Sequence, residues 1–248
     1  MAIPILYSGT RNASSWAMRA WLALREADIE FVEQIVDIRR PQRFINLAQI
    51  GAFSPSATVP VLVDEDLVIF DSLAIMEYAN DLASGALLPS NVADRARARS
   101  LLAWQHSGLS NICNRISFES AFYPHKRTLS HLERTECARL FAQLERHLDS
   151  SGGPYLFGKL SLADLVLVPA VVRLTRHDLD LAPWPRAQSW TVALLERPTV
   201  VEWLSEADLE PHIWFDDYLA VEAHDERASF AMRAGEPRNW TLRLDGRF

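Results

Sequence analysis

Two adjacent serines at the start of an expected helix are the residues best placed for chemistry in this sequence. Ser14 and Ser15 follow an expected strand over residues 3–7 and open an apolar-periodic helix over residues 12–24. A hydroxyl at the positive N-terminus of a helix can donate a hydrogen bond to a thiolate that a ligand brings. For a thiol of pKa about 8.5, stabilising the anion by about 2 kcal/mol lowers the pKa by roughly 1–2 units. The alternative is that either serine only caps the helix.

Residues 58–78 supply a second group of candidates. Two short β-branched runs flank an acidic turn, which predicts a hairpin, and the pair Asp71-Ser72 then caps an apolar-periodic helix. A cis Val59–Pro60 bond at the start of the first strand would leave the Val59 N–H and C=O available to an extended ligand. The carboxylate, the hydroxyl and the helix N–H groups would face the same space. This combination suits one end of a zwitterionic, peptide-like ligand, and a plain hairpin followed by a capped helix is the alternative.

These two groups of residues resemble the motifs of a known family. Ser54–Leu62 (SPSATVPVL) and Phe70–Tyr78 (FDSLAIMEY) resemble the glutathione-binding half of the soluble glutathione transferases. Asn12–Leu22 (NASSWAMRAWL) is similar to their serine-type members, particularly the zeta-like and bacterial groups. Thioredoxin-like folds often carry a reactive CxxC at this helix start, and this chain has no cysteine there. We therefore do not expect the protein to cycle a disulfide of its own at this position.

The resemblance implies a role for each residue of the site. Ser14 is implied as the hydroxyl that activates the glutathione thiol, with Ser15 as the alternative. The implied glutathione-binding residues are Gln42, Thr58, Val59, Pro60, Asp71 and Ser72. The residues implied for the second substrate, from the first helix of the helical domain, are Trp104, His106, Ser107, Asn111 and Arg115. For His106 a partly buried structural role stays equally open, and for Arg115 a surface role is the alternative.

One position departs from the family pattern. Many relatives carry Lys, Arg or Gln where Thr58 stands, and that longer side chain helps to hold a glutathione carboxylate. Threonine is shorter and uncharged, so this contact is expected to be weaker here. Arg39, Arg40 or Gln42 on the preceding segment is a candidate replacement donor.

The order of the expected elements predicts two domains. Residues 1–82 read as β-α-β, a variable segment, then β-β-α, which is an α/β thioredoxin-like domain with a mixed four-stranded sheet. A linker over 83–91 leads to an all-helical C-terminal domain over 92–210. The extension over 211–248 is rich in aromatic residues, so we expect it to pack on the body of the protein, over the second-substrate cleft, or at a dimer interface.

Several features of the helical domain are specific enough to test. We expect one long helix from residue 91 with its apolar stripe reaching residue 116, a loop over 120–128, and a second long helix that stops near Gly152. Ser161–Asp164 is a capping box for a buried helix over 162–172 that Pro169 should kink. The box also resembles the family's folding motif, and we assign Asp164 a structural role without chemistry.

Composition excludes several other classes of function. The 248 residues carry a formal net charge of −7, which argues against nucleic acid as a partner. The two cysteines are too few for a disulfide framework, and the seven histidines show no metal-ligand spacing, so no metal is expected. No run is long enough to span a membrane, and no secretory signal is recognisable. A cytoplasmic protein is expected, and the resemblance adds a homodimer with a role in detoxification.

Three functions follow from this interpretation. The first is a transferase that binds glutathione, stabilises its thiolate and transfers it to a small electrophile. The second is a glutathione-dependent cis-trans isomerase of a maleyl-type diacid, in which glutathione is a cofactor that is returned. The third is a non-catalytic binding protein with the same fold. The sequence does not identify the electrophile, because its pocket comes from the least recognisable part of the chain.

Overall fold

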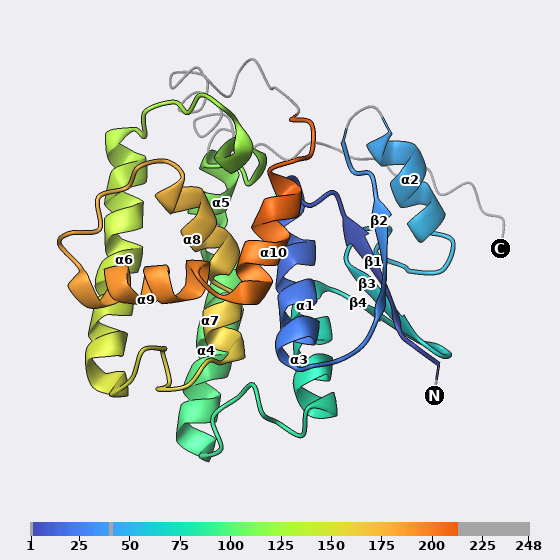
Figure 1. The fold of residues 1–248 in the computed structure, drawn as a ribbon, viewed down its shortest axis with the longest axis horizontal. Helices are drawn as coiled ribbons and strands as arrows, with labels where there is room; N and C mark the ends of the chain where they lie inside the picture. The colour runs from blue at the N-terminus through green and yellow to red at the C-terminus, as the bar shows by residue number, and fades with distance from the viewer. Residues whose placement is uncertain (1, 40–41, 213–248) are drawn as a thin grey trace, which may run out of the picture.

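The structure is a computed structural model that describes residues 2–39 and 42–212. In it, the N-terminal half of the protein forms a sheet covered by helices (Figure 1). Its elements are β1 (Ile5–Gly9), α1 (Ser15–Glu26), β2 (Val32–Val36), α2 (Arg43–Ile50), β3 (Val61–Asp64), β4 (Leu67–Phe70) and α3 (Ser72–Leu82). The strand order is β2-β1-β3-β4, with β1 parallel to β2 and β3 antiparallel to both of its neighbours. This mixed four-stranded sheet confirms the predicted thioredoxin-like domain.

Helix α1 joins the two halves of the molecule. It packs beside α3 against the sheet, and on its other side it contacts α7, α8 and α10 of the helical half (Figure 1). An apolar helix that is covered all round belongs in the interior, and accordingly Met18, Leu22 and Leu24 are completely buried. The N-terminus of α1 therefore opens at the boundary between the two halves, where a ligand can contact both.

The C-terminal half consists of helices throughout its described part, as predicted. They are α4 (Val92–Gly108), α5 (Ser110–Arg115), η1 (Glu119–Phe122), α6 (His131–Ser151), α7 (Leu162–Leu165), α8 (Val168–Thr175), α9 (Pro185–Leu195) and α10 (Pro198–Ala207). Helix α6 ends at Gly152 in the left-handed conformation, with φ of 70°, which is the predicted stop. The linker expected over 83–91 stays a prediction.

Three local predictions in this half were wrong in detail. The long helix expected through residue 116 breaks at Leu109, which separates α4 from α5, directly after a glycine that disfavours helix by about 1 kcal/mol. The expected loop over 120–128 begins with the 3-10 helix η1. Instead of kinking one helix, Pro169 lies in the first turn of the separate helix α8, where its missing N–H breaks no helical hydrogen bond.

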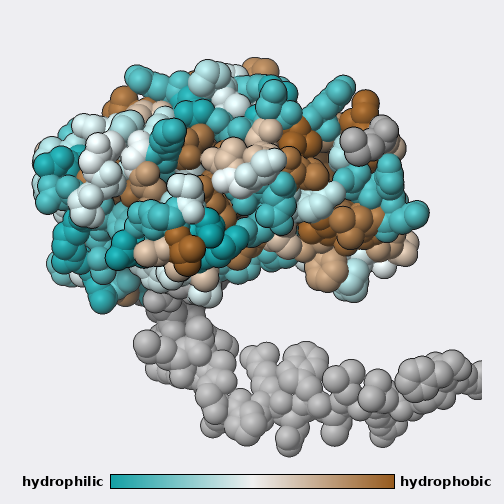
Figure 2. Space-filling model, turned by 90° about the horizontal axis from the view of Figure 1, so that it is seen from below, coloured by the Kyte–Doolittle hydropathy of each residue, from teal (hydrophilic) through white to brown (hydrophobic). Residues whose placement is uncertain are grey.

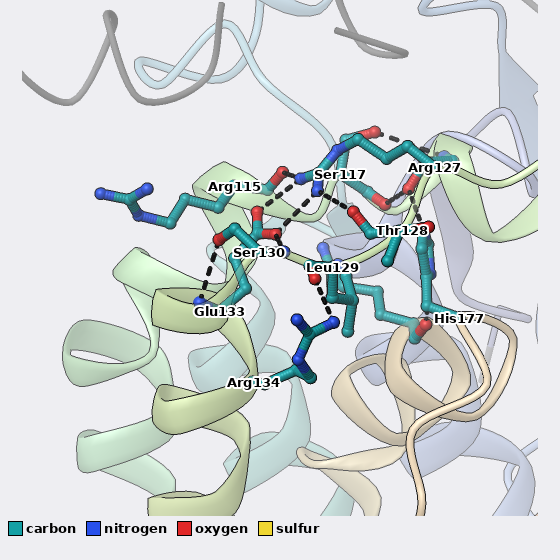
Figure 3. Close-up of polar contacts among 11 residues, drawn as sticks. Arg115, Ser117, Arg127, Thr128, Leu129, Ser130, Glu133, Arg134 and His177 are labelled. Carbon is teal, nitrogen blue, oxygen red and sulfur yellow. Dashed lines mark hydrogen bonds and ion pairs between the residues drawn. The ribbon is translucent and has the colours of Figure 1, made fainter. Parts of the chain in front are cut away.

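A buried ion pair ties the loop before α6 to that helix. Arg127 donates from Nη1 to Glu133 Oε2 at 2.7 Å, and its Nη2 contacts Glu133 Oε1, with both side chains 2% exposed (Figure 3). Arg127 Nη2 also donates to the carbonyl oxygen of Arg115 at 2.9 Å, at the C-terminal end of α5. The pair therefore connects α5, the loop and α6 in one network next to the cavity described below.

The end of the described chain is anchored beside the start of α1. The Asn12 N–H donates to Glu210 Oε2 at 2.9 Å, and the Asn12 amide donates to the carbonyl oxygens of Glu210 and Pro211 at 3.1 and 3.2 Å. The extension expected to pack on the body begins here, but residues 213–248 lie outside the described part. Within the described residues, no helix combines the length and the apolar character that crossing a membrane requires.

Candidate functional site

A cavity of about 580 Å³ lies between the two halves of the molecule. Its walls are the N-terminus of α1, Ile38 and two residues of α2, the segment 58–60 before β3, the start of α3, the end of α4, α5, the segment 117–119 and one residue of α8. A volume of this size is typical of small-molecule sites. The two groups of residues singled out in the sequence, Ser14-Ser15 and residues 58–72, meet at this cavity.

The two serines at the start of α1 line the cavity but make different contacts. Ser14 is the N-cap, and its Oγ accepts a hydrogen bond from the Ala17 N–H at 3.2 Å. Ser15 Oγ instead accepts a hydrogen bond from Arg173 Nη2 at 3.0 Å. Each hydroxyl thus has its oxygen occupied as an acceptor, and each keeps its O–H to donate to an anion. Both serines are buried, at 3% and 4% exposure, so such a bond would form away from bulk water.

Gly9 allows the two sides of the site to approach each other. A Cβ placed on Gly9 would lie 2.7 Å from Ser14 Cβ, 2.9 Å from Ser14 Oγ and 3.0 Å from Val59 Cγ2. Side chains do not tolerate contacts this short, and neither neighbour is the far end of a flexible chain. The absence of a side chain at the end of β1 therefore sets the distance between Ser14 and Val59.

We expect Gly9→Ala to lower affinity for a ligand that spans Ser14 and Val59, because one of the two must shift. Overpacking of this kind costs about 1–3 kcal/mol, which corresponds to a loss of affinity of roughly 5- to 150-fold. Titration calorimetry with glutathione on the folded variant measures the loss. The control is Gly85→Ala, since nothing lies within 4 Å of a Cβ at that position, although its φ of 81° adds strain far from the cavity. Equal affinities for Gly9→Ala and the parent protein would contradict the prediction.

The segment before β3 presents unpaired backbone to the cavity. The Val59–Pro60 peptide bond is cis, as expected from the sequence. Among the described residues, neither the Val59 N–H nor its C=O pairs with another backbone group, while β3 begins its ladder two residues later, at Val61. Thr58, Val59 and Pro60 all line the cavity. An extended peptide can therefore pair with Val59 as an added strand would.

Asp71 and Ser72 open α3 beside this segment, because Val61 of β3 pairs with Phe70 at the end of β4. Asp71 Oδ1 accepts the Leu73 N–H at 2.8 Å, and Asp71 Oδ2 lies 3.3 Å from His106 Nε2. The Ser72 side chain is 2% exposed, and its Oγ has no hydrogen-bond partner. A buried hydroxyl without a partner is costly, so Ser72 is a group for which a ligand would supply the missing bond. Asp71 has φ of 82°, an uncommon value for a residue other than glycine.

The start of α2, together with the segment that leads into it, contributes a residue that the sequence did not single out. Gln42 is exposed and does not line the cavity, whereas the adjacent Arg43 does. Arg39 donates to Asp37 from Nε and Nη2 at 2.8 and 2.9 Å, so its guanidinium is already paired, and Arg40 lies outside the described residues. Arg43 is thus the cation that faces the cavity from this segment.

Of the four expected second-substrate residues whose side chains the structure describes, the helical half brings one to the cavity. His106 lines it, with its ring 5.1 Å from that of Trp16 in an edge-to-face contact. Trp104 lines a separate hollow between α4 and α6, and Ser107 donates back to the Ala103 carbonyl oxygen at 2.8 Å. Arg115 does not line the cavity, and the side chain of Asn111 lies outside the described part.

Residues beyond the break at Leu109 replace them. Cys113, Ser117, Phe118, Glu119 and Arg173 line the helical side of the cavity. The prediction assumed one continuous helix with all of its cavity-facing residues on one face. Because the helix breaks between α4 and α5, residues after 108 face the cavity from positions that this face does not include. Of these residues, only Arg173 could have been found from the sequence, because it is a charged residue within the apolar stretch that follows the capping box.

Two buried arginines carry positive charge at this site, Arg173 of α8, which lines the cavity, and Arg19 of α1, which does not. Arg173 is 4% exposed, and its Nε is buried without a partner, although Nη1 donates to the Pro169 carbonyl oxygen at 3.2 Å. Arg19 is 1% exposed and lies over the Trp16 ring, 4.2 Å from its centroid, with Nε and Nη1 lacking partners. Burial first and then repulsion from Arg173 lower the pKa of Arg19 to about 9. Burial also raises the pKa of Glu119, which lines the same cavity.

His177 supports the backbone that carries Arg173. Its Nδ1 lies 2.6 Å from the Arg173 carbonyl oxygen and its Nε2 lies 3.3 Å from Ser120 Oγ. Burial, with a smaller contribution from Arg127 and Lys126, lowers the pKa of His177, and the Arg173 carbonyl opposes this effect. The ring is therefore held neutral in the folded protein at a pH where it would take up a proton in the unfolded chain.

We expect the free energy of unfolding to decrease as the pH falls below about 6.5, the ordinary histidine value. The unfolded chain binds a proton at His177 first, so stability is lost from that pH down to the lowered pKa of the folded state. His177→Gln should flatten this decrease, measured by urea unfolding across the pH range. A residual slope should remain because burial also lowers the pKa of His147. An unchanged slope in His177→Gln would contradict the assignment.

Fold and site together define a class of protein. A thioredoxin-like domain joined to a helical domain places helix-start hydroxyls, unpaired strand backbone and an acidic-Ser cap around one cavity, which is the arrangement of a thiol-peptide-binding protein. Comparison with known families makes this specific. The family model "Glutathione S-transferase, N-terminal domain" matches residues 13–82, and the model "Glutathione S-transferase, C-terminal domain" matches residues 121–205. The chain belongs to the glutathione S-transferase family.

Individual relatives agree with this membership. The chain is 33% identical to the maleylacetoacetate isomerase of Mus musculus over 73% of this chain and 83% of that protein. It is 29% identical to a probable maleylacetoacetate isomerase of Caenorhabditis elegans over 80% of this chain and 91% of that protein. Among solved structures, it is similar to a glutathione S-transferase-I bound with lactoylglutathione, with a TM-score of 0.67 and 25% identity over 83% of this chain and all of that one.

Proposed function

We propose that this protein binds glutathione in the cavity between its two halves and uses its thiolate on a small electrophile, as a glutathione transferase. The observation that carries the proposal is the convergence of three groups on one cavity. They are the unpaired Val59 backbone, the unpartnered and buried Ser72 hydroxyl, and the two serine hydroxyls at the start of α1. A γ-glutamyl peptide with a central thiol has the donors and acceptors to satisfy all three.

Each part of the site has a separate task in this proposal. Asp71 attracts the ammonium group of the γ-glutamyl end while Ser72 bonds its carboxylate, and Val59 pairs with the cysteinyl backbone. Ser14 donates its O–H to the sulfur, and the N-terminus of α1 adds favourable positive potential. When bound, glutathione supplies the nucleophilic sulfur that bonds to the electrophile. Arg43 is the cation available for a carboxylate near Thr58, in place of the longer side chain that many relatives carry.

A second candidate is the isomerisation of a maleyl-type diacid, in which glutathione is returned. The specific observation in its favour is a pair of buried arginines, Arg173 of α8, which lines the cavity, and Arg19 of α1. Arg173 Nε and Arg19 Nε and Nη1 are buried without acceptors. Buried guanidinium nitrogen atoms without acceptors are costly, and a carboxylate of the second substrate would supply the missing hydrogen bonds. Relatives of comparable length are named maleylacetoacetate isomerases, which adds support. Arg173 would then orient the diacid through one carboxylate while Ser14 holds the thiolate.

Capture of the full-length protein on immobilised glutathione, with elution by reduced glutathione, tests the proposal. We expect retention, followed by turnover of either an aryl halide or a cis-diacid. Retention without turnover of either would indicate a non-catalytic binding protein, and failure to bind would overturn the proposal. Product analysis separates the two reactions, because the transferase consumes thiol in proportion to product and the isomerase leaves its concentration unchanged.

The proposal extends to assembly and location. Exposed apolar surface gathers on the half of the molecule formed by the sheet, seen from below in Figure 2, and Phe44 and Ile45 of that half are 70% and 69% exposed. Apolar surface of this kind commonly marks a protein interface, so we include a homodimer in the proposal. Light scattering coupled to gel filtration tests it, and a monomer at working concentration would contradict it. As a transferase, the protein would act in detoxification in the cytoplasm, which cell fractionation tests.

A further inference from the structure

We propose that Cys113 is a site of reversible glutathionylation, at which the protein forms a mixed disulfide with a glutathionyl group delivered by glutathione disulfide bound in the cavity. The inference rests on the proposed function, because it requires the cavity to bind glutathione. Nothing in the catalytic scheme above uses Cys113, and the start of α1 carries no cysteine that could do so.

The position of Cys113 distinguishes it from the other cysteine of the chain. Cys113 lies in α5, is partly exposed and lines the same cavity as Ser14, Val59 and Asp71. Cys137 lies in α6, is completely buried, and burial raises the pKa of its thiol to about 12. Thiol–disulfide exchange requires an accessible sulfur that can ionise, so the cavity exposes one reactive thiol and the core keeps the other inert.

The charges around Cys113 supply an independent reason for a ligand at this position. Arg173 shares the cavity wall with Cys113, and its side chain is 4% exposed with an unpartnered Nε. Arg19 is 1% exposed and has two unpartnered nitrogen atoms. Burial lowers the pKa of both arginines, and attraction to the Cys113 sulfur opposes this effect in both. The sulfur therefore lies within the field of two buried guanidinium groups, and Arg173 Nε at the cavity wall is buried without an acceptor.

This arrangement suits the exchange reaction chemically. The Cys113 thiolate attacks one sulfur of glutathione disulfide, a new sulfur–sulfur bond forms to Cys113, and the old one breaks. The leaving sulfur departs as a glutathione thiolate and takes a proton from water, so no further oxidant is needed. Negative charge spreads over three sulfur atoms during the transfer, and the buried arginines are placed to stabilise it. Attack by a second glutathione thiolate reverses the step and restores Cys113.

The modification would regulate the site. A glutathionyl group attached to α5 would extend into the cavity of about 580 Å³ between the helical wall and the start of α1. That space is where the second substrate must approach the sulfur held by Ser14. We therefore expect oxidised glutathione to close the site to the electrophile and reduced glutathione to reopen it. Activity would then depend on the redox state of the thiol pool that supplies the substrate.

The test is to incubate the reduced full-length protein with glutathione disulfide and to follow the intact mass. We expect one glutathionyl group, located on Cys113 by peptide mapping, absent from Cys113→Ser and retained by Cys137→Ala. With 2-hydroxyethyl disulfide, which lacks the peptide, the reaction of Cys113 should be about tenfold slower because binding no longer positions the disulfide. S-methylglutathione should slow the glutathione disulfide reaction by occupying the cavity. Mapping on the parent protein decides the site even if Cys113→Ser folds poorly.

Two results would overturn the inference. One is an unmodified Cys113, and the other is a rate that is equal for both disulfides and insensitive to S-methylglutathione. Capture of the same preparation on immobilised glutathione separates this failure from that of the proposed function. Protein that is retained but not modified selectively at Cys113 refutes the inference alone. Protein that is neither retained nor selectively modified refutes both.

Discussion

Replacing Ser14 by alanine should lower kcat/KM for thiol transfer by about 100- to 1,000-fold, the cost of removing one hydrogen-bond donor from a developing or bound anion. Ser14 is the hydroxyl that caps α1, lines the cavity and lies beside Val59 across Gly9. Without its O–H, the bound thiol should ionise at a higher pH, by roughly 1–2 units for a bond worth about 2 kcal/mol. Ultraviolet absorbance of the bound thiolate, followed across pH, measures this shift directly.

The difficulty with Ser14→Ala is that it also removes a helix cap, which costs about 1 kcal/mol of stability. Ser14→Asp separates the two effects. Its carboxylate can still accept the Ala17 N–H, so the cap is retained, but it cannot donate to a thiolate and adds a repelling charge. We expect Ser14→Asp to be as stable as the parent protein and at least as inactive as Ser14→Ala. A stable and active Ser14→Asp variant would exclude Ser14 as the thiol-activating residue.

Ser15 provides the matched control on the neighbouring position. Its Oγ accepts a hydrogen bond from Arg173 Nη2, so Ser15→Ala should disturb Arg173 rather than the thiol. We therefore expect the thiolate titration to stay near that of the parent protein, while KM for an anionic electrophile rises. If instead Ser15→Ala shifts the thiolate titration and Ser14→Ala does not, the roles of the two serines are reversed.

The thioredoxin-like half and its part of the site were predictable because their signals are local. The hairpin before α3, the Asp71 cap and the serines at α1 each depend on residues within a few positions of one another. The cis bond before Pro60 also has a local sequence signal in the surrounding motif. These elements form most of the sheet side of the cavity; the exception is the start of α2, where Arg43 lines the cavity in place of the expected Gln42.

The helical wall could not be predicted in the same way, because it depends on one break in the chain. A continuous helix through Leu109 would have kept one stripe of residues facing the sheet domain. The break turns α5 and the segment after it, so that Cys113 and Glu119 reach the cavity while Trp104 faces α6. Arg173 arrives from a helix about 60 residues further along, and its burial depends on contacts between distant segments. Sequence periodicity carries no information about that packing.

Replacing Asp164 by alanine should lower the free energy of unfolding by about 3–5 kcal/mol, or prevent the recovery of folded protein. The carboxylate is completely buried, and it accepts hydrogen bonds from the Leu156 and Ser161 N–H groups, the Ser161 hydroxyl and Trp190 Nε1, all at 2.7–2.9 Å. Burial raises the pKa of Asp164, and these four donors oppose the effect. Alanine would leave the four donors buried without an acceptor at the centre of the helical half.

The matched control for this prediction is Asp94→Ala. Asp94 also lies in the first turn of a helix, and it accepts from Asn91 and Arg97, but its side chain is exposed to solvent. Water can replace those partners, so the denaturant midpoint of Asp94→Ala should stay close to that of the parent protein. A large decrease in the free energy of unfolding for Asp164→Ala, with a small decrease for Asp94→Ala, would show that the capping box stabilises the helical half by satisfying buried donors. Helix α7 packs on α1, so unfolding of the helical half should also displace the serines at the start of α1. We therefore expect Asp164→Ala to lose its capture on glutathione together with its fold.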